Sequence, residues 1–170
     1  MPRLPESAAG GRNVSAFLHM LAWSELGPDY LKRSDNGYNV IVTGIDGKLE
    51  LFTNYADHPF SGGRASKLVN RKGLTSTASG RYQQMLRDWP HYRAQLKLPD
   101  FGPLSQDLLA IQHIRECRAL DDVKAGRIVQ AVSKCRNIWA SLPGAGYNQR
   151  EHRIEQLLAQ YVAAGGVLAP

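Results

Sequence analysis

Apolar residues recur at helical spacing near the start of the chain. Asn13 suits the N-cap of a helix. The apolar positions that follow it at intervals of three and four are Val14, Phe17, Leu18, Leu21 and Ala22. This spacing predicts an amphipathic helix that ends before Gly27 and Pro28. Glu25 continues the same period, so the pattern places its carboxylate on the buried face of the helix.

A carboxylate on a buried face points to chemistry as well as to structure. Partial removal from water disfavours the charged form, so the pKa of Glu25 is expected to rise toward the working pH, as a general acid requires. From spacing alone, an equal alternative is that Glu25 caps local structure or pairs with an arginine at the helix end.

Between Tyr38 and Phe52 the pattern changes from helical spacing to alternation. Residues 39–43 and 48–52 read as two strands, and the turn between them contains Asp46 and Gly47. We expect one antiparallel hairpin, to which a third short strand can add. Asp57 and His58 follow the hairpin. They suit a metal or proton-transfer pair, but no second His or Cys lies nearby at ligand spacing, which favours a structural or substrate-contacting role for His58.

Most of the remaining chain has helical patterns. They cover residues 81–89, interrupted by Pro90, then 91–96, 105–117 with Ser105 as the N-cap, 121–124, 127–139 and 148–164. The Ser/Thr-rich loop 76–80 suits an anion but lacks the pattern of a nucleotide-binding phosphate loop. Helices outnumber strands and the strands are segregated, so we predict an α+β fold that is mostly helical with one small antiparallel sheet.

The chain length of 170 residues is that of one domain. Residues 1–12 contain two prolines and two glycines and no periodicity, and read as a disordered leader before a single domain at 13–170. The start of the chain has no apolar segment of the signal-peptide type, and no run is long enough to span a membrane. We expect a chain made in the cytoplasm that needs another factor for release.

Charge and cysteine content narrow the class of partner. The formal net charge is +6, from 21 Lys and Arg against 15 Asp and Glu, which suits nucleic acid, an acidic membrane face or an acidic polysaccharide. The basic residues are scattered rather than gathered in one stripe, so we expect no nucleic-acid partner. Cys117 and Cys135 have neither metal-ligand nor disulfide-scaffold spacing, and we expect two free thiols.

Five segments together resemble one known family. They are FLHMLAWSE at 17–25, GYNVIV at 37–42, ELFTNYADHP at 50–59, STASGRYQ at 76–83 and NIWASLPGAGY at 137–147. With these segments the chain resembles the lambda-type bacteriophage endolysins over nearly all of residues 14–166. The resemblance implies a lysozyme-like fold and lytic transglycosylase activity on bacterial peptidoglycan.

The resemblance also implies site residues and partners. Glu25 of the Trp-Ser-Glu motif is the implied catalytic acid, and the implied substrate-binding residues are Tyr38, His58, Ser79, Tyr82, Gln83 and Tyr147. Segments 67–74 and 142–153 are implied to be two mobile lips. Neither a metal nor a cofactor is expected. The resemblance further implies a monomer that acts on glycan strands of peptidoglycan. It implies that the protein stays in the host cytoplasm until a holin releases it to the wall in the periplasm.

The sequence departs from the family pattern at a few positions. Asn36 and Asn39 stand where His and Asp are common in the family, which argues against titrating roles there. The hairpin tip 43–48 and the loop 60–66 are longer than is usual in the family.

The number of carboxylates separates the possible reactions. A hydrolytic glycosidase uses two, whereas a transglycosylase that forms a 1,6-anhydro sugar between MurNAc C1 and O6 needs only one. The resemblance implies the second reaction, non-hydrolytic cleavage of the MurNAc-β-1,4-GlcNAc bond by Glu25. The alternatives are a hydrolytic muramidase with Asp35 or Asp57 as the second carboxylate, a non-catalytic wall-binding module, and a nucleic-acid-binding module.

Overall fold

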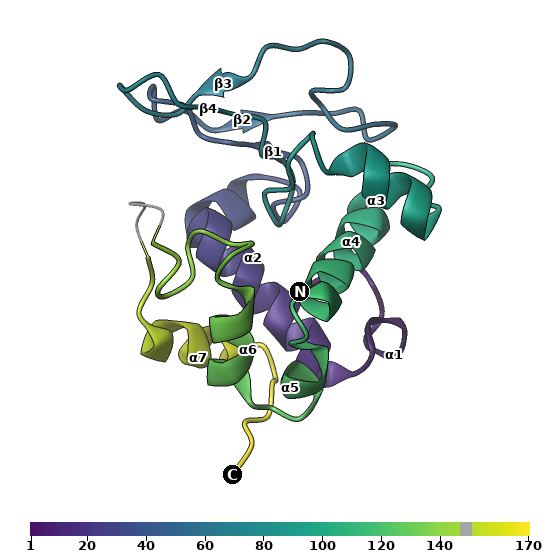
Figure 1. Cartoon of the computed structure of the whole chain (residues 1–170), viewed down its shortest axis with the longest axis vertical. Helices are drawn as coiled ribbons and strands as arrows, with labels where there is room; N and C mark the ends of the chain where they lie inside the picture. The colour runs from purple at the N-terminus through teal and green to yellow at the C-terminus, as the bar shows by residue number, and fades with distance from the viewer. Residues whose placement is uncertain (147–150) are drawn as a thin grey trace. The chain divides into compact units, whose positions relative to one another are not determined.

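The computed structural model describes residues 1–146 and 151–170, which form two compact units. The helical unit comprises Met1–Gly27 and Asp107–Pro170, and the sheet unit comprises Pro28–Gln106. The helices of the described chain are α1 Glu6–Ala9, α2 Arg12–Arg33, α3 Trp89–Leu96, α4 Pro103–Glu116, α5 Leu120–Lys124, α6 Ile128–Cys135 and α7 Ile154–Ala163. Its strands are β1 Val40–Ile41, β2 Glu50–Leu51, β3 Lys67–Leu68 and β4 Thr75–Ser76 (Figure 1).

Helix α2 contains the predicted amphipathic segment. The side chains of Val14, Phe17, Leu18 and Leu21 are fully buried in the helical unit, as their spacing predicts. The helix extends past the predicted end but is kinked at Gly27, which has φ 70° and ψ 167°. Glycine tolerates a positive φ, and a proline is accepted in the first turn of the segment that follows, because no backbone N–H is needed there.

The rest of the helical unit gathers around apolar residues of α4, α5, α6 and α7. Helices α5 and α6 contact each other (Figure 1). Ile114, Val123, Ala131 and Leu157 are fully buried, one from each of the four helices. Helix α4 begins at Pro103, and its start is not capped by Ser105 as predicted, because the Ser105 hydroxyl donates instead to Asp100, 3.1 Å away.

The leader differs from its prediction as a disordered segment. It contains α1, and the Leu4 side chain is buried. The backbone N–H groups of Arg3 and Leu4 donate to the buried carboxylate of Asp107 at 2.9 and 2.8 Å. A buried carboxylate needs donors, and these two contacts hold the leader on the helical unit.

The sheet unit contains the predicted hairpin but arranges its strands in two sheets rather than one. Strands β1 and β2 pair antiparallel with Val40 opposite Leu51, and β3 and β4 pair antiparallel with Lys67 opposite Ser76. The α+β class is as predicted. The second pair was missed because the segment 67–76 that contains its strands has no alternation of apolar and polar residues.

The predicted helix over residues 81–88 is wrong. Ser79 and Gln84 exchange backbone hydrogen bonds of 2.9 and 2.8 Å and so close a tight loop, in which Gln83 has φ 50°. Helix α3 begins only at Trp89, with Pro90 in its first turn. The proline therefore starts this helix and does not interrupt one, because the first turn has no use for its missing N–H.

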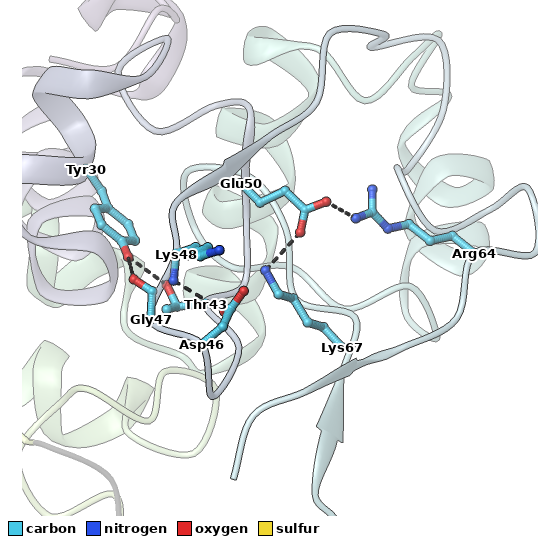
Figure 2. A network of polar contacts seen from close by, with 8 residues as sticks. All are labelled: Tyr30, Thr43, Asp46, Gly47, Lys48, Glu50, Arg64 and Lys67. Carbon is cyan, nitrogen blue, oxygen red and sulfur yellow. Dashed lines mark hydrogen bonds and ion pairs between the residues drawn. The ribbon is translucent and has the colours of Figure 1, made fainter.

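Glu50 on β2 connects the two sheets. Its carboxylate accepts a hydrogen bond of 2.8 Å from the Lys67 ammonium on β3 and a second one from the Arg64 guanidinium in the preceding loop (Figure 2). These two cations hold the pKa of the Glu50 carboxyl below its ordinary value. At the hairpin tip in the same view, the Tyr30 hydroxyl accepts a hydrogen bond of 3.2 Å from Thr43.

Candidate active site

Glu25 lies in the helical unit at the last turn of α2 before the kink at Gly27. Its side chain is half-buried, which matches the partial removal from water that the helical period predicts. The Ser141 hydroxyl donates a hydrogen bond of 2.6 Å to Glu25 Oε1. No basic side chain forms an ion pair with Glu25 among the ion pairs of the described residues, so the alternative of an Arg partner has no support.

The surroundings of Glu25 change its acidity in the predicted direction. Burial raises the pKa of Glu25 from its ordinary value of 4.5 to about 7, and hydrogen bonds from the Ser141 hydroxyl and backbone N–H offset part of that rise. A carboxyl group with this pKa is about half protonated at neutral pH. It can therefore donate a proton and, once ionised, accept one.

Two serines form a short chain of hydroxyl groups that ends at Glu25. The Ser24 and Ser141 hydroxyl oxygens are 2.7 Å apart. Because Ser141 has one hydroxyl proton and gives it to Glu25, Ser24 must be the donor to Ser141. Ser141 lies 116 positions from Glu25 and was not predicted as a site residue. A serine in the NIWASLPGAGY segment has no distinguishing spacing, so periodicity alone offers no signal for it.

His152 holds the segment that contains Ser141 against the end of α2. Its backbone N–H donates to the Ser141 carbonyl at 3.0 Å, and its Nε2 lies 3.1 Å from the Ser24 carbonyl oxygen. The His152 ring also contacts the Trp23 ring at a centroid distance of 4.6 Å. The predicted lip 142–153 is therefore joined to the Glu25 network at its C-terminal end.

The glycine-rich turn after Ser141 is organised by a carboxylate. Glu151 accepts hydrogen bonds of 2.8 Å from the backbone N–H groups of Gly144 and Gly146, and these bonds hold its pKa below the ordinary value. Both glycines have positive φ, at 75° and 74°, which a residue with a side chain rarely adopts. Tyr147, a predicted substrate-binding residue, lies outside the described residues.

The other predicted substrate-binding residues belong to the sheet unit. Tyr38, Ser79 and Tyr82 are buried, and Gln83 is half-buried. The Arg81 guanidinium is also buried and lies 5.2 Å from the Tyr38 ring and 5.9 Å from the Tyr82 ring. Burial gives the two tyrosines and Ser79 a packing role and does not support their predicted contact with a saccharide.

Gln106 holds this packed loop in place. Its side-chain oxygen accepts a hydrogen bond of 2.9 Å from the Arg81 backbone N–H, and its amide nitrogen donates to the carbonyls of Tyr38 and Phe101 at 2.9 and 2.7 Å. A Cβ atom at Gly80 would lie 2.2 Å from the same side-chain oxygen. The glycine of the STASGRYQ segment is therefore needed for the close approach of Gln106, a residue that no sequence pattern predicts as a site residue.

His58 is buried in the sheet unit. Its Nε2 lies 3.1 Å from the Gln84 carbonyl, its ring packs edge-on to Phe101 at 4.6 Å, and burial lowers its pKa. Asp57 contacts the His58 backbone N–H at 2.7 Å, so this contact does not make the two side chains a proton-transfer pair. Among the residues that the structure describes, no group of three His, Cys, Asp or Glu side chains could hold a metal ion.

The two candidate second carboxylates are both engaged within the sheet unit. Asp57 accepts a hydrogen bond of 2.5 Å from the Trp89 indole and pairs with Arg93 at 3.3 Å. Partial burial raises the pKa of Asp57, but the hydrogen bonds from Trp89, the His58 backbone N–H and Ser61, together with the charge of Arg93, hold it below its ordinary value. Asp35 accepts a hydrogen bond of 2.9 Å from the Tyr55 hydroxyl. Both contacts are those of structural aspartates.

A groove of about 830 Å³ lies in the sheet unit beside Asp57 and Trp89. Its rim includes the cationic side chains of Arg87, Arg93 and Lys97. None of its lining residues belongs to the helical unit, so it is not a cavity around Glu25.

Among the described residues, the structure contains no helix with the length and hydrophobicity of a membrane span.

Comparisons with known proteins agree on one family. The family model described as Endolysin matches residues 15–168. The chain is 63% identical over 158 residues to the endolysin of Escherichia phage P2, covering 93% of this chain and 96% of the relative. It is 51% identical over 155 residues to the endolysin of Escherichia phage lambda, covering 90% and 91%.

Solved structures show the same relationship. A structure of bacteriophage lambda lysozyme complexed with a chitohexasaccharide matches with a TM-score of 0.82 and 48% identity, covering 93% of this chain and 97% of that chain. A further structure of lysozyme from bacteriophage lambda matches with a TM-score of 0.77 and 46% identity over the same shares. These matches confirm the predicted lysozyme-like fold.

Proposed function

The chain belongs to the endolysin family, whose lysozyme-like enzymes lyse the bacterial cell wall, and from that premise we propose that it is a peptidoglycan lytic transglycosylase. It cleaves the MurNAc-β-1,4-GlcNAc bond without water and leaves a 1,6-anhydro-MurNAc end. Glu25 is the one catalytic group. The observation that supports this assignment best is a half-buried carboxyl group with a pKa of about 7, held by Ser141 and without a cationic partner of its own among the described ion pairs.

Glu25 acts first as an acid and then as a base. In its protonated form it gives its proton to the oxygen that links MurNAc to GlcNAc, and the bond from that oxygen to MurNAc C1 breaks. The resulting carboxylate removes the proton from the C6 hydroxyl of the same MurNAc, whose oxygen forms the new bond to C1. Glu25 ends protonated, as it began. The nucleophile belongs to the substrate and is already close to C1, which removes the entropic cost of recruiting a water.

The contacts of the other acidic residues support a reaction with one carboxylate. A hydrolase would need a second carboxylate to act as nucleophile or to activate water. Asp35 accepts a hydrogen bond from Tyr55, and Asp57 is bound to Trp89 and Arg93. Contacts of this kind are typical of aspartates that organise a turn or a core. A hydrolytic muramidase remains the second candidate, because the structural relatives are named lysozyme.

Glycan strands of peptidoglycan are the proposed partner. One relative of known structure is a lambda lysozyme in complex with a chitohexasaccharide, a ligand that supports a saccharide chain as the substrate class here. We further propose that residues 13–170 act as one catalytic domain and as a monomer. A holin releases the protein from the host cytoplasm to the wall in the periplasm. The reaction as written uses no metal or cofactor.

The product decides between the two reactions. Purified peptidoglycan digested with the chain is expected to yield muropeptides that end in 1,6-anhydro-MurNAc, which are lighter by one water than hydrolytic products. Mass spectrometry of the digest measures both classes, and a muramidase that is known to hydrolyse serves as the control. Reducing-end MurNAc as the main product would establish the hydrolytic reaction instead.

Ser141→Ala is expected to shift the pH dependence of activity. Activity requires protonated Glu25, so it falls as pH rises through the pKa of about 7. The Ser141 hydroxyl stabilises the charged form, and its removal raises the pKa of Glu25 further. The alkaline limb of the pH profile of kcat/KM should move to higher pH by about one unit. A shift of this size corresponds to the free energy of one hydrogen bond to a charged group.

Rates of cleavage of fluorescently labelled peptidoglycan, measured from about pH 5 to about pH 9, test this shift. This range extends roughly two pH units on each side of the pKa of Glu25. Ser105→Ala is the matched control, because it removes a buried serine hydroxyl from the sheet unit. An alkaline limb that is the same in Ser141→Ala and in the wild type would show that this hydrogen bond does not act on the catalytic carboxyl group.

A further inference from the structure

Helix α3 borders a groove that the catalytic mechanism does not use. The α3 groove is the cavity of about 830 Å³ beside Asp57 and Trp89. Its lining residues come from α3, from the chain on either side of this helix and from the loop that follows β2 (Figure 1). All of them belong to the sheet unit, whereas Glu25 belongs to the helical unit. A cavity of this volume can hold a small organic ligand or a short peptide.

Much of the groove is apolar. The side chains of Trp89 and Leu98 are only 2% and 5% exposed, so the groove reaches down to the core of the sheet unit. Leu86, Pro90 and Ala94 add further apolar lining. Methyl and methylene groups of a ligand can leave water against these side chains.

Asp57 is the one acidic residue among the described lining residues, and its charge is already matched. It accepts a hydrogen bond of 2.5 Å from the Trp89 indole and pairs with Arg93 at 3.3 Å. Arg93 also donates to the Pro99 carbonyl at 3.0 Å, and its Cζ lies 5.7 Å from the centre of the Trp89 ring. The carboxylate of Asp57 therefore does not repel an anionic ligand from the groove.

Two cations of the groove are not matched in this way. Arg87 is exposed and meets Asp88 at 3.6 Å, an exposed pair of a kind that contributes little. Lys97 is exposed and takes part in none of the ion pairs of the described residues. With Arg93 they give the lining three cations against one carboxylate, so the groove favours a ligand with more than one negative charge.

The backbone at Lys97 supports a role for its side chain. Lys97 follows the last residue of α3 in the left-handed conformation, with φ 53° and ψ 43°. This conformation lets the backbone N–H groups of Lys97 and Leu98 donate to carbonyls of α3, at 3.3 Å to Ala94 and 2.9 Å to Arg93. Glycine ends helices in this way at lower cost. The lysine instead carries a cation to the groove at a position where the fold itself would prefer glycine.

We propose that the α3 groove binds the acidic stem peptide of peptidoglycan. This inference rests on the proposed function, because the occupant is a part of the proposed substrate. A stem peptide carries several carboxylates on short apolar residues, and this combination matches the lining of the groove. Its carboxylates pair with Arg87 and Lys97, and its methyl and methylene groups lie against Trp89 and Leu98. The groove thus holds the wall through its peptides, apart from the glycan chemistry at Glu25.

Isothermal titration calorimetry of the purified chain with a stem tetrapeptide tests this site. The probe is N-acetylated L-alanine, γ-linked D-glutamate, meso-diaminopimelate and D-alanine, without any sugar. It should bind at one site with a dissociation constant below about 1 mM at low ionic strength. Added salt should weaken the binding, because exposed charges are screened. The same peptide with its carboxylates amidated should not bind.

Substitutions locate the binding in the α3 groove. Arg87→Gln and Lys97→Gln should each weaken the binding of the tetrapeptide by about 3- to 10-fold, as expected for partly exposed hydrogen bonds to charged groups. Lys32→Gln is the matched control, because it removes an exposed cation of the same unit outside the groove, and it should leave the affinity unchanged.

Lys97→Gly separates the role of the cation from folding. Glycine suits the positive φ at this position, so the midpoint of thermal unfolding should stay at or above the wild-type value. The affinity for the tetrapeptide should nevertheless fall as in Lys97→Gln. A glycine variant that binds the tetrapeptide as well as the wild type does would show that the Lys97 ammonium is not part of the site.

Other outcomes would also overturn the proposal. One is the absence of binding below about 1 mM tetrapeptide. Others are equal binding of the amidated peptide and tighter binding of inorganic phosphate or of a short DNA duplex, which would assign the groove to a different anion. The probe has no glycosidic bond, so its binding does not depend on the reaction. A chain that forms anhydro-muropeptides but does not bind the tetrapeptide would contradict this inference alone, and the reverse result would contradict the proposed function alone.

Discussion

Glu25→Gln should lower kcat/KM on peptidoglycan by at least about 10²- to 10⁴-fold, the usual contribution of a general acid and base. Glutamine has nearly the same shape and still accepts the hydrogen bond that Ser141 donates at 2.6 Å. It cannot give a proton to the glycosidic oxygen or remove one from the C6 hydroxyl. The midpoint of thermal unfolding should not fall, because the variant no longer has to bury an ionisable group.

The rate of turbidity loss of permeabilised cells or purified walls measures the activity, and thermal unfolding followed by circular dichroism measures the stability. Glu155→Gln is the matched control, since it makes the same change at an exposed residue of α7 in the same unit. Activity within a few fold of wild type in Glu25→Gln would rule out Glu25 as the catalytic acid.

Gln106→Leu is expected to destabilise the protein by about 3 to 5 kcal/mol. The side chain of Gln106 is 0% exposed and serves the Arg81 backbone N–H and the carbonyls of Tyr38 and Phe101. Leucine removes all three hydrogen bonds and leaves three buried backbone groups without that partner. Each such group costs about 1 to 3 kcal/mol, and relaxation of the 79–84 loop recovers part of the total.

Urea unfolding at neutral pH gives the free energy of unfolding for this comparison. Gln95→Leu on the exposed side of α3 is the control and should change stability by no more than about 0.5 kcal/mol. A loss below about 1 kcal/mol in Gln106→Leu would mean that the loop does not depend on these hydrogen bonds. Because the loop contains Gln83, saccharide binding is expected to weaken together with stability.

Elements with a long, regular pattern were predictable from the sequence. The buried face of α2 and the apolar face of α4 repeat over three or more turns, so local spacing identifies them. The hairpin was predictable from its turn residues and alternation, although β1 and β2 are shorter than the pattern suggests. The family resemblance extended this information to the lysozyme-like fold, which the structural matches confirm.

Elements that depend on distant partners were not predictable. Residues 81–88 have the composition of a helix, yet the backbone exchange between Ser79 and Gln84 and the side chain of Gln106 hold them in a loop. The leader has the composition of a disordered segment, yet Asp107 binds its backbone. In both cases a buried polar group more than 20 positions away decides the local conformation, and local propensity is too weak to oppose it.

Glu25 shows the same division within one residue. The sequence by itself determined that a carboxylate continues the apolar period of α2 just before a glycine, but its spacing favoured a raised pKa and a cap or Arg pair equally. Only the tertiary structure decided how far the pKa rises, because Ser141 comes from the other end of the chain and counteracts part of the effect of burial. A pKa depends on every group around the carboxyl, whereas a sequence pattern records only the neighbours along one helix.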